Sequence, residues 1–266
     1  MPTDAPTRPL PAPHDVTLAD VYALDFGQRT ADLPTWDALA AACPRGPVLD
    51  VACGDGRATA ALAARGRNVL GVDLNPAFLA RARQRGLDAK YADLTQHRSV
   101  HGWGFALPPA ALVVCAYSSL YLLPHDAQER LVACMAEALA PGGVLAIEVF
   151  VPVLVGDGTM DQPCADPNDA SRPPWVRRTR YTVYPESRTT RIERLYGPER
   201  ERWTMRLTEI VRWRDPAELV LLARRAGLEQ VQVDTVSTTL RVSRAGFDER
   251  YVVPIAPGHA LLTARA

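Results

Sequence analysis

A glycine-containing turn between an apolar run and an alanine-rich run is the first feature of this chain that could do chemistry. Residues 48–51 are mostly branched and apolar, Gly54 and Gly56 follow them, and residues 58–63 favour a helix. Glycines allow backbone conformations that other residues avoid, and they let a ligand touch the main chain. The helix that follows offers free N–H groups in its first turn. The pattern predicts a strand, a tight loop and a helix that bind a nucleotide-like ligand.

An acidic residue lies at the end of the next apolar run. Asp73 follows residues 69–72, seventeen positions after Gly56. In dinucleotide-binding units, an acidic residue about 20 positions past the glycine loop holds the ribose hydroxyls. The nicotinamide version needs the spacing G-x-G-x-x-G, whereas residues 54–59 read GDGRAT, with threonine at position 59, where the third glycine or alanine is required. The loop and Asp73 therefore predict a ribose-containing ligand without a complete pyrophosphate site.

Three segments resemble the cofactor motifs of class I S-adenosylmethionine-dependent methyltransferases, in particular those that act on small molecules of specialised metabolism. They read VLDVACGDGRAT from residue 48, GVDLNPAFLARAR from residue 71 and YADLTQ from residue 91. The resemblance covers roughly residues 16–150 and 215–266. S-adenosylmethionine contains no phosphate, which agrees with the incomplete pyrophosphate loop. The resemblance implies that S-adenosylmethionine is the cofactor.

The resemblance also implies which residues bind the cofactor. Asp93 would take the adenine amino group, and the backbone of Leu94 would meet the ring. Ala52 stands where many members have the first glycine of the loop, a sterically mild exchange. Tyr22, in a segment that resembles the lid of these enzymes, would bond the methionine end; the alternative is an aromatic side chain that packs a helix onto the sheet. The full implied set is Tyr22, Asp50, Ala52, Gly54, Gly56, Asp73, Leu74, Asp93, Leu94 and Ala116.

Strands and helices alternate along much of the chain at the spacing of right-handed crossovers. Besides the elements above, we expect helices near residues 77–85, 126–139 and 216–226, and strands near residues 89–92, 111–116, 144–150, 231–236 and 259–263. The prediction is an α/β fold with a doubly wound, mostly parallel, seven-stranded Rossmann-like sheet. This domain would comprise residues 43–150 and 215–266, after a disordered, proline-rich leader at 1–14 and a helical lid at 15–42.

The pattern changes after residue 150. Residues 156–174 read as a loop, and three runs rich in β-forming residues follow, at 175–184, 190–196 and 203–213. Turn-forming residues join these runs, which predicts a three-stranded antiparallel meander inside an insertion at 151–214 on the substrate side. Residues 171–214 carry 12 arginines and five glutamates. An anionic acceptor is one interpretation of that excess, and a solvated arginine face is the other.

Methyl transfer requires alignment of the acceptor with the methyl carbon and, for some acceptors, removal of a proton. By the two-residue period of a strand, Glu209 lies on the same face as Leu207 and Val211. We therefore name Glu209 as the first candidate catalytic base, with Glu148 and Tyr117 as weaker candidates on the sheet side. The alternative for Glu209 is an ion pair with a neighbouring arginine, because an unpaired buried carboxylate is costly.

Composition narrows the classes of partner. The 266 residues carry 30 basic and 30 acidic side chains, so the net charge favours neither nucleic acid nor a membrane surface as a partner. No apolar stretch is long enough to cross a bilayer and no signal sequence opens the chain, so we expect a cytoplasmic protein. The five cysteines form no C-x-x-C pair and are interpreted as buried thiols. Because no carboxylate cluster has metal-ligand spacing, we expect no metal.

The preferred function is S-adenosylmethionine-dependent methyl transfer to a nitrogen, oxygen or carbon atom of a small molecule. Alternatives are another reaction of the same cofactor, such as cyclisation or elimination, a nucleic-acid or protein methyltransferase, a nicotinamide oxidoreductase, and a cofactor-binding scaffold without catalysis. A nucleic-acid methyltransferase would carry an Asn/Asp-Pro-Pro-aromatic tetrad after the fourth strand, where residues 117–120 read YSSL. The oligomeric state is open, with a homodimer as one option.

Overall fold

The structure is a computed structural model, and it describes residues 19, 22, 30, 32–96, 99–150, 158–164, 175–197, 203, 205–234, 240–243, 250–253 and 259–266. The predicted leader at 1–14 and most of the first half of the predicted lid lie outside these residues. Ala19 and Tyr22 are helical, and α2 (Leu33–Ala42) forms the second half of the lid segment.

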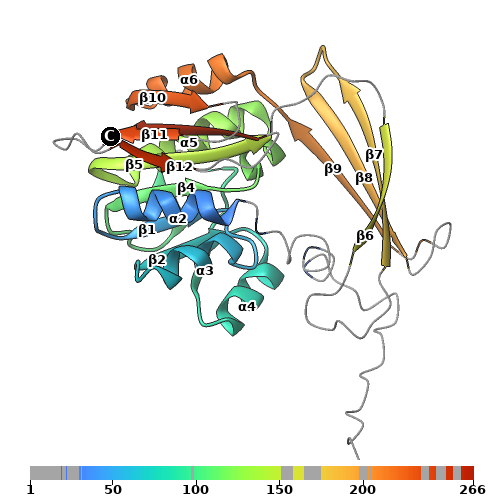
Figure 1. Ribbon diagram of the computed structural model, residues 1–266, viewed down its shortest axis with the longest axis horizontal. Helices are drawn as coiled ribbons and strands as arrows, with labels where there is room; N and C mark the ends of the chain where they lie inside the picture. The colour runs from blue at the N-terminus through green and yellow to red at the C-terminus, as the bar shows by residue number, and fades with distance from the viewer. Residues whose placement is uncertain are drawn as a thin grey trace, which may run out of the picture.

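Seven strands form the central sheet, in the order β10-β13-β5-β4-β1-β2-β3 (Figure 1). Their bounds are β1 (Val48–Val51), β2 (Val69–Asp73), β3 (Asp88–Tyr91), β4 (Ala110–Cys115), β5 (Leu139–Phe150), β10 (Glu229–Asp234) and β13 (His259–Arg265). Neighbouring strands from β5 to β3 run parallel, whereas β13 runs antiparallel to both β5 and β10. This confirms the predicted doubly wound, mostly parallel sheet.

Helices cover both faces of this sheet, because its central strands are apolar on both sides. All six residues of β4, for example, are buried. On one face, α2 and α3 pack Trp36 and Leu62 against the strands; on the other, α5 and α6 pack Met135 and Leu222. No helix within the described residues is long and apolar enough to cross a membrane. The remaining helical bounds are α3 (Arg57–Ala64), α4 (Pro76–Gln84), α5 (His125–Glu137), α6 (Pro216–Arg225), and the 3-10 helices η1 (Val100–Trp103) and η2 (Ser119–Leu122).

A second, antiparallel sheet stands beside the first and has four strands rather than the predicted three (Figure 1). The additional strand, β6, lies in a segment that the sequence analysis takes as a loop. Its residues are poor strand formers, but its backbone pairs with β7 (Trp175–Tyr184). An ion pair also joins the two strands, with 2.8 Å between Asp161 Oδ1 and Arg178 Nε. β6 is an edge strand, which tolerates Pro163. The bounds are β6 (Gly158–Cys164), β7 (Trp175–Tyr184), β8 (Thr189–Gly197) and β9 (Met205–Arg212).

The alternation predicted for the last strand of this meander is confirmed. From Met205 to Val211, every second residue is partly or fully buried, and those between are exposed. Val211 and the following Trp213 join the main core. The backbone oxygen of Arg212 accepts a hydrogen bond from Gln128 Nε2 of α5 at 2.7 Å. The meander is therefore anchored to the helix that follows the fourth strand, and it shares one hydrophobic core with the central sheet.

The long connection before β13 contains a hairpin that the sequence analysis does not predict. Its strands are β11 (Leu240–Ser243) and β12 (Arg250–Val253), which pair antiparallel. All five cysteines are buried, as predicted. Among the described residues, no three His, Cys, Asp or Glu side chains come close enough together to hold a metal ion.

Gly71 in β2 faces the loop that follows β1 at close range. A Cβ at this position would meet Cys53 Sγ at 2.7 Å and Thr59 Oγ1 at 3.4 Å. We expect Gly71→Ala to lower the free energy of unfolding by about 1–3 kcal/mol, because overpacking moves neighbouring side chains off their preferred rotamers. Urea denaturation measures the change. Gly158→Ala is the control and should stay within about 0.5 kcal/mol, since no described atom lies within 4 Å of a Cβ there; equal midpoints for wild type and Gly71→Ala would contradict the close packing.

Candidate functional site

A cavity of about 280 Å³ lies at the carboxyl ends of the parallel strands. Residues that follow β1, β2, β3 and β4 line it, and β1 lies between β4 and β2, where the strand order reverses. Ligands in open α/β sheets bind at such reversal points. Of the thirteen residues that the sequence analysis names for the site, nine line this cavity: Tyr22, Asp50, Ala52, Gly54, Asp73, Leu74, Leu94, Ala116 and Tyr117.

The loop after β1 has a left-handed backbone at three positions, with φ of 59° at Ala52, 58° at Gly54 and 86° at Gly56. This conformation costs a residue with a Cβ about 1–2 kcal/mol, so alanine at position 52 is a less mild exchange than expected. Gly56 has a further constraint, because a Cβ there would collide with Leu87 Cδ1. Gly56 does not line the cavity. The absence of a Cβ at Gly56 lets the loop pack on Leu87, and its contact with the cofactor stays a prediction.

Asp73 ties the loop after β1 to the loop after β2. Its Oδ2 accepts the Gly54 N–H at 2.9 Å, and its Oδ1 accepts the Asn75 N–H at 2.8 Å. Burial raises the pKa of this carboxyl, and the backbone donors oppose the rise. The backbone of Leu74 also acts on this carboxylate as a donor. A carboxylate has about four lone-pair positions, so Asp73 retains acceptor capacity for a ligand hydroxyl group in the cavity.

Asp50 is the most deeply buried carboxyl of the cavity, with 1% of its surface exposed. Its Oδ2 accepts the Thr59 hydroxyl at 2.6 Å, whereas Oδ1 has no hydrogen-bond partner among the described residues. Burial raises the pKa of Asp50 to about 7, and the Thr59 hydroxyl opposes this shift. A buried carboxyl with an unmatched oxygen beside a cavity favours a ligand that is cationic or donates hydrogen bonds.

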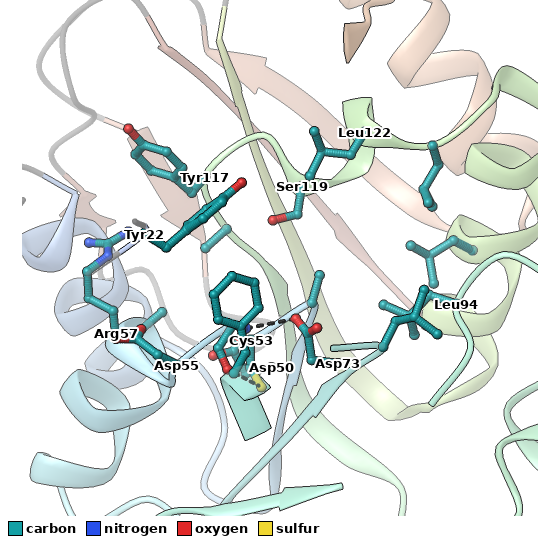
Figure 2. A pocket seen from close by; sticks show the side chains of 18 of the residues that line it. Tyr22, Asp50, Cys53, Asp55, Arg57, Asp73, Leu94, Tyr117, Ser119 and Leu122 are labelled. Atoms are coloured by element: carbon teal, nitrogen blue, oxygen red, sulfur yellow. Dashed lines mark hydrogen bonds between the residues drawn. The ribbon is translucent and has the colours of Figure 1, made fainter. Parts of the chain in front are cut away.

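The two ends of the cavity differ in polarity, as Figure 2 shows. Arg57, Tyr22 and Tyr117 gather at one end, Leu94 lies at the other, and Asp73 lies between them. Tyr22 also packs its ring edge-on against Phe78, with ring centres 5.0 Å apart. The shape suits an elongated ligand with a charged end, a hydroxylated middle and an apolar end.

Several lining side chains were not foreseen from the sequence, and Arg57 is the most consequential. Its guanidinium forms a bidentate ion pair with Asp32, in which Nη2 and Oδ2 are 2.7 Å apart. It also lies 5.4 Å from the centre of the Tyr117 ring. Arg57 is the first residue of α3, directly after the glycine loop, and this position could have indicated that it lies beside the cavity. Its pairing with Asp32 could not be predicted, because Asp32 lies 25 residues earlier and no local pattern pairs the two. Other unforeseen lining residues are Phe78, Thr95 and Ser119.

Asp93 shapes the loop after β3 and does not itself line the cavity. Its Oδ1 accepts both the N–H and the hydroxyl of Thr95, at 2.9 and 2.6 Å. These bonds close a turn that presents Leu94 and Thr95 to the cavity. The contact between Asp93 and an adenine amino group stays a prediction.

Glu148, in the neighbouring strand β5, supports the loop after β4 through hydrogen bonds. It is 2% exposed; its Oε2 accepts the Tyr117 N–H at 2.9 Å, and its backbone oxygen accepts the Ser118 N–H at 3.0 Å. Tyr117 and Ser118 both have left-handed backbones, with φ of 56° and 58°, which these bonds stabilise. Glu148 does not line the cavity. The geometry thus assigns it to the support of Tyr117, and its role as a base stays a prediction.

Glu209, the first candidate base, is engaged through both carboxylate oxygens. Its Oε2 pairs with the guanidinium of Arg194 on β8, and its Oε1 accepts the Tyr22 hydroxyl at 2.6 Å. Its side chain is 13% exposed and does not line the cavity. The structure therefore contains the ion pair that the sequence analysis gives as the alternative. Both oxygens of Glu209 are therefore engaged with protein groups, and its role as a base stays a prediction.

The raised pKa of Asp50 predicts a pH-dependent difference between wild type and Asp50→Asn. An unfolded aspartate ionises near pH 4, but the buried carboxyl keeps its proton up to about pH 7. Between these values ionisation favours the unfolded chain, so the wild type loses stability relative to the variant as pH rises, by at most about 1.4 kcal/mol per pH unit. Urea denaturation of both ligand-free proteins at pH 5, 6, 7 and 8 measures the difference, which should level off above pH 7. A constant difference over this range would contradict the burial of an unmatched carboxyl.

Comparisons with known proteins agree with this geometry. A model of the methyltransferase domain family matches residues 48–143, which contain the glycine loop, Asp73 and Asp93. Trans-aconitate 2-methyltransferase from Paracidovorax citrulli is 35% identical over 104 residues. These residues are 38% of this chain and 38% of that protein, so the match spans well under half of the relative.

Solved structures resemble almost the whole chain. The amino pentose methyltransferase CalS10 from Micromonospora echinaspora, solved with S-adenosylmethionine bound, has a TM-score of 0.67 at 23% identity and covers 92% of this chain and 96% of its own. DesVI from Streptomyces venezuelae has a TM-score of 0.69 at 21% identity, with 94% and 98% covered. The sugar N-methyltransferase KedS8 from a Streptoalloteichus species has a TM-score of 0.64 at 20% identity, with 100% and 98% covered. Residues 48–143 thus match the methyltransferase domain family, and the chain shares the fold of these solved methyltransferases.

Proposed function

We propose that this protein is an S-adenosylmethionine-dependent methyltransferase that methylates a nitrogen, oxygen or carbon atom of a small molecule. The observation that carries the proposal is a pair of carboxyls in one cavity. Asp73 retains acceptor capacity beside its backbone donors, and Asp50 has an unmatched buried oxygen. A ribose diol and a cationic amino-acid end are the groups that match these two carboxyls. Both residues lie within the matched methyltransferase domain.

The remainder of the cavity fits the same cofactor. Leu94 at the apolar end would contact the adenine ring, and Asp73 would hold the ribose hydroxyls. The methionine end would lie near Arg57 and Tyr22, where a guanidinium suits a carboxylate and a phenol oxygen suits an ammonium group. The lining contains more aspartates than basic residues, which favours a cofactor with a positive sulfonium.

When bound, S-adenosylmethionine supplies a methyl group that its sulfonium activates for displacement. The contribution of the chain itself is alignment. Tyr117 and Ser119 line the cavity from the loop after β4, and Glu148 fixes the backbone of that loop at Tyr117. Groups held in this way make a two-molecule reaction behave as a one-molecule reaction, which lowers its entropic barrier. Leu122 and Leu123 make the same region of the lining apolar.

We propose that the insertion at 151–214, including the meander, covers the acceptor. Its last strand is anchored to α5, which follows the loop of Tyr117, and segments mounted on a fixed scaffold commonly carry specificity. CalS10 and KedS8 are described as amino pentose and sugar N-methyltransferases, so amino sugars are the first acceptor class to test. Small carboxylates are the second, because the curated relative is named for trans-aconitate.

Methyl-deuterated S-adenosylmethionine tests the reaction directly. The protein is incubated with the labelled cofactor and a panel of amino sugars and small carboxylates, and the masses of the products are measured by mass spectrometry. A product that is heavier by the labelled methyl group supports the proposal and identifies the acceptor. Breakdown of the cofactor without label in any product would instead favour another reaction of the same cofactor.

We expect Asp73→Ala to weaken S-adenosylmethionine binding by about 10- to 150-fold, because two charge-assisted hydrogen bonds to the ribose are lost. Calorimetric titration of both proteins measures the change. Asp37→Ala, which removes an exposed aspartate paired with Arg65 away from the cavity, should leave the affinity within about twofold. Unchanged affinity in Asp73→Ala, or tight binding of a nicotinamide dinucleotide by the wild type, would overturn the assignment of the cofactor.

A further inference from the structure

Three arginines of the meander surround one glutamate in a groove. The carboxylate oxygens of Glu193 on β8 lie near three guanidinium groups. The distances are 3.3 Å to Arg180 Nη1, 3.9 Å to Arg191 Nη2 and 3.5 Å to Arg206 Nε. These four residues and Thr182 line a groove of about 300 Å³. By formal charge the groove has an excess of two positive groups, and protonation of Glu193 would only enlarge this excess.

The register of the strands brings these side chains together. In the β7–β8 ladder Arg180 is opposite Glu193, and Thr182 is opposite Arg191. Arg206, on β9, is diagonal to Glu193 across the β8–β9 ladder. Directly opposite and diagonal neighbours on one face of a sheet are within reach of long side chains. The groove is therefore built by the sheet itself and does not depend on a loop.

The other face of the same strands packs toward the central sheet. Ile192 of β8 belongs to the main hydrophobic core, and Glu209 of β9 contacts Tyr22, which lines the cofactor cavity. Because successive side chains of a strand alternate between faces, Arg191 and Glu193 point away from that side. The lining residues of the groove and of the cofactor cavity have no member in common. The groove is thus separate from the cofactor cavity.

The groove also contains a part of the arginine excess of residues 171–214. The formal charge of other arginines in this segment is matched more evenly, because each has a carboxylate partner outside the groove. These pairs are Arg178 with Asp161, Arg188 with Glu218, Arg194 with Glu209 and Arg214 with Glu129. In the groove, by contrast, three guanidinium groups share one carboxylate.

The donors in the groove are suited to phosphate oxygens. A guanidinium presents five N–H donors in a planar fork that can bind two phosphate oxygens at once. Among the described residues, the guanidinium of Arg180 donates one hydrogen bond, to Glu193 at 3.3 Å, and those of Arg191 and Arg206 donate none. Most of the donors are therefore available to a ligand, and Thr182 adds a hydroxyl group.

Size and charge favour a small ligand over a nucleic acid. The groove has a volume at the lower end of small-molecule pockets, which run from roughly 300 to 1,000 Å³. The chain as a whole has no net charge, so no extended positive field surrounds the groove to attract a long polyanion. Two surplus positive groups match the charge of one phosphate or diphosphate group.

We propose that this groove is a second binding site, which takes the phosphate or diphosphate group of a small molecule. The inference goes beyond the proposed function and does not rest on it, because the site shares no residue with the cofactor cavity. The ligand of the groove should bind whether or not the cofactor is present.

Calorimetric titration of the full-length protein with inorganic pyrophosphate tests the site, at low ionic strength because salt screens exposed charges. We expect saturable binding to the wild type. Arg191→Gln and Arg206→Gln should each weaken it by about 3- to 10-fold, since each removes charge-assisted hydrogen bonds at a partly exposed site. These two side chains are 51% and 64% exposed, so their replacement should leave the fold intact.

Arg224→Gln is the matched control, because it removes the same charge from an exposed position on α6. Its affinity for pyrophosphate should stay within about twofold of that of the wild type. A saturating concentration of S-adenosylhomocysteine should not change the affinity of the wild type for pyrophosphate.

The absence of saturable binding to the wild type, or an equal loss in all three variants, would overturn the site. Binding of succinate as tight as that of pyrophosphate would overturn the assignment to phosphate groups, and tighter binding of a short single-stranded oligonucleotide would overturn the assignment to small molecules. Competition between pyrophosphate and S-adenosylhomocysteine would place the anion in the cofactor cavity and contradict a separate site. Failure to bind S-adenosylhomocysteine would count against the proposed function alone.

Discussion

The hydrogen bond from the Gly54 N–H to Asp73 is the contact on which the rest of the site depends. It joins the loop after β1 to the end of β2, and it requires the left-handed turn in which Gly54 lies. The same carboxylate then caps the turn at Asn75 that starts α4. One side chain thus sets the distance between two loops and still retains acceptor positions for a ligand. Glycine is required beside it because the turn needs a positive φ and leaves the cavity open.

The ligand-free site contains a buried carboxyl that the protein does not fully satisfy. Asp50 has one oxygen without a hydrogen-bond partner among the described residues, and burial raises its pKa to about 7. Such a group costs folding free energy, so the fold alone gives no reason for it. A cationic cofactor would supply the missing partner and would stabilise the ionised carboxylate. Arg57 opposes the rise in this pKa through its charge, while its guanidinium forms a bidentate ion pair with Asp32.

The parts of the structure that were predicted are those whose signal is local. The apolar run of β4, the glycine turn and Asp73 at the end of β2 each follow from a few adjacent residues, and all are found where expected. β6 was missed because its residues favour no strand; it exists only because β7 offers an edge for pairing. The packing of Gly56 on Leu87 could not be predicted either, because Leu87 lies 31 residues later in the chain and outside the glycine motif.

The contacts of Glu209 could not be predicted from the residues next to it in the sequence. The two-residue period placed it on the buried face of β9 correctly, and burial then demanded a partner. Which partner it has depends on the register between β8 and β9, which sets Arg194 on the diagonal, and on a tyrosine 187 residues away. Both facts belong to the tertiary structure and leave no trace in the neighbouring sequence. In the folded chain this carboxylate accepts the Tyr22 hydroxyl and pairs with Arg194, so it connects the lid segment with the meander.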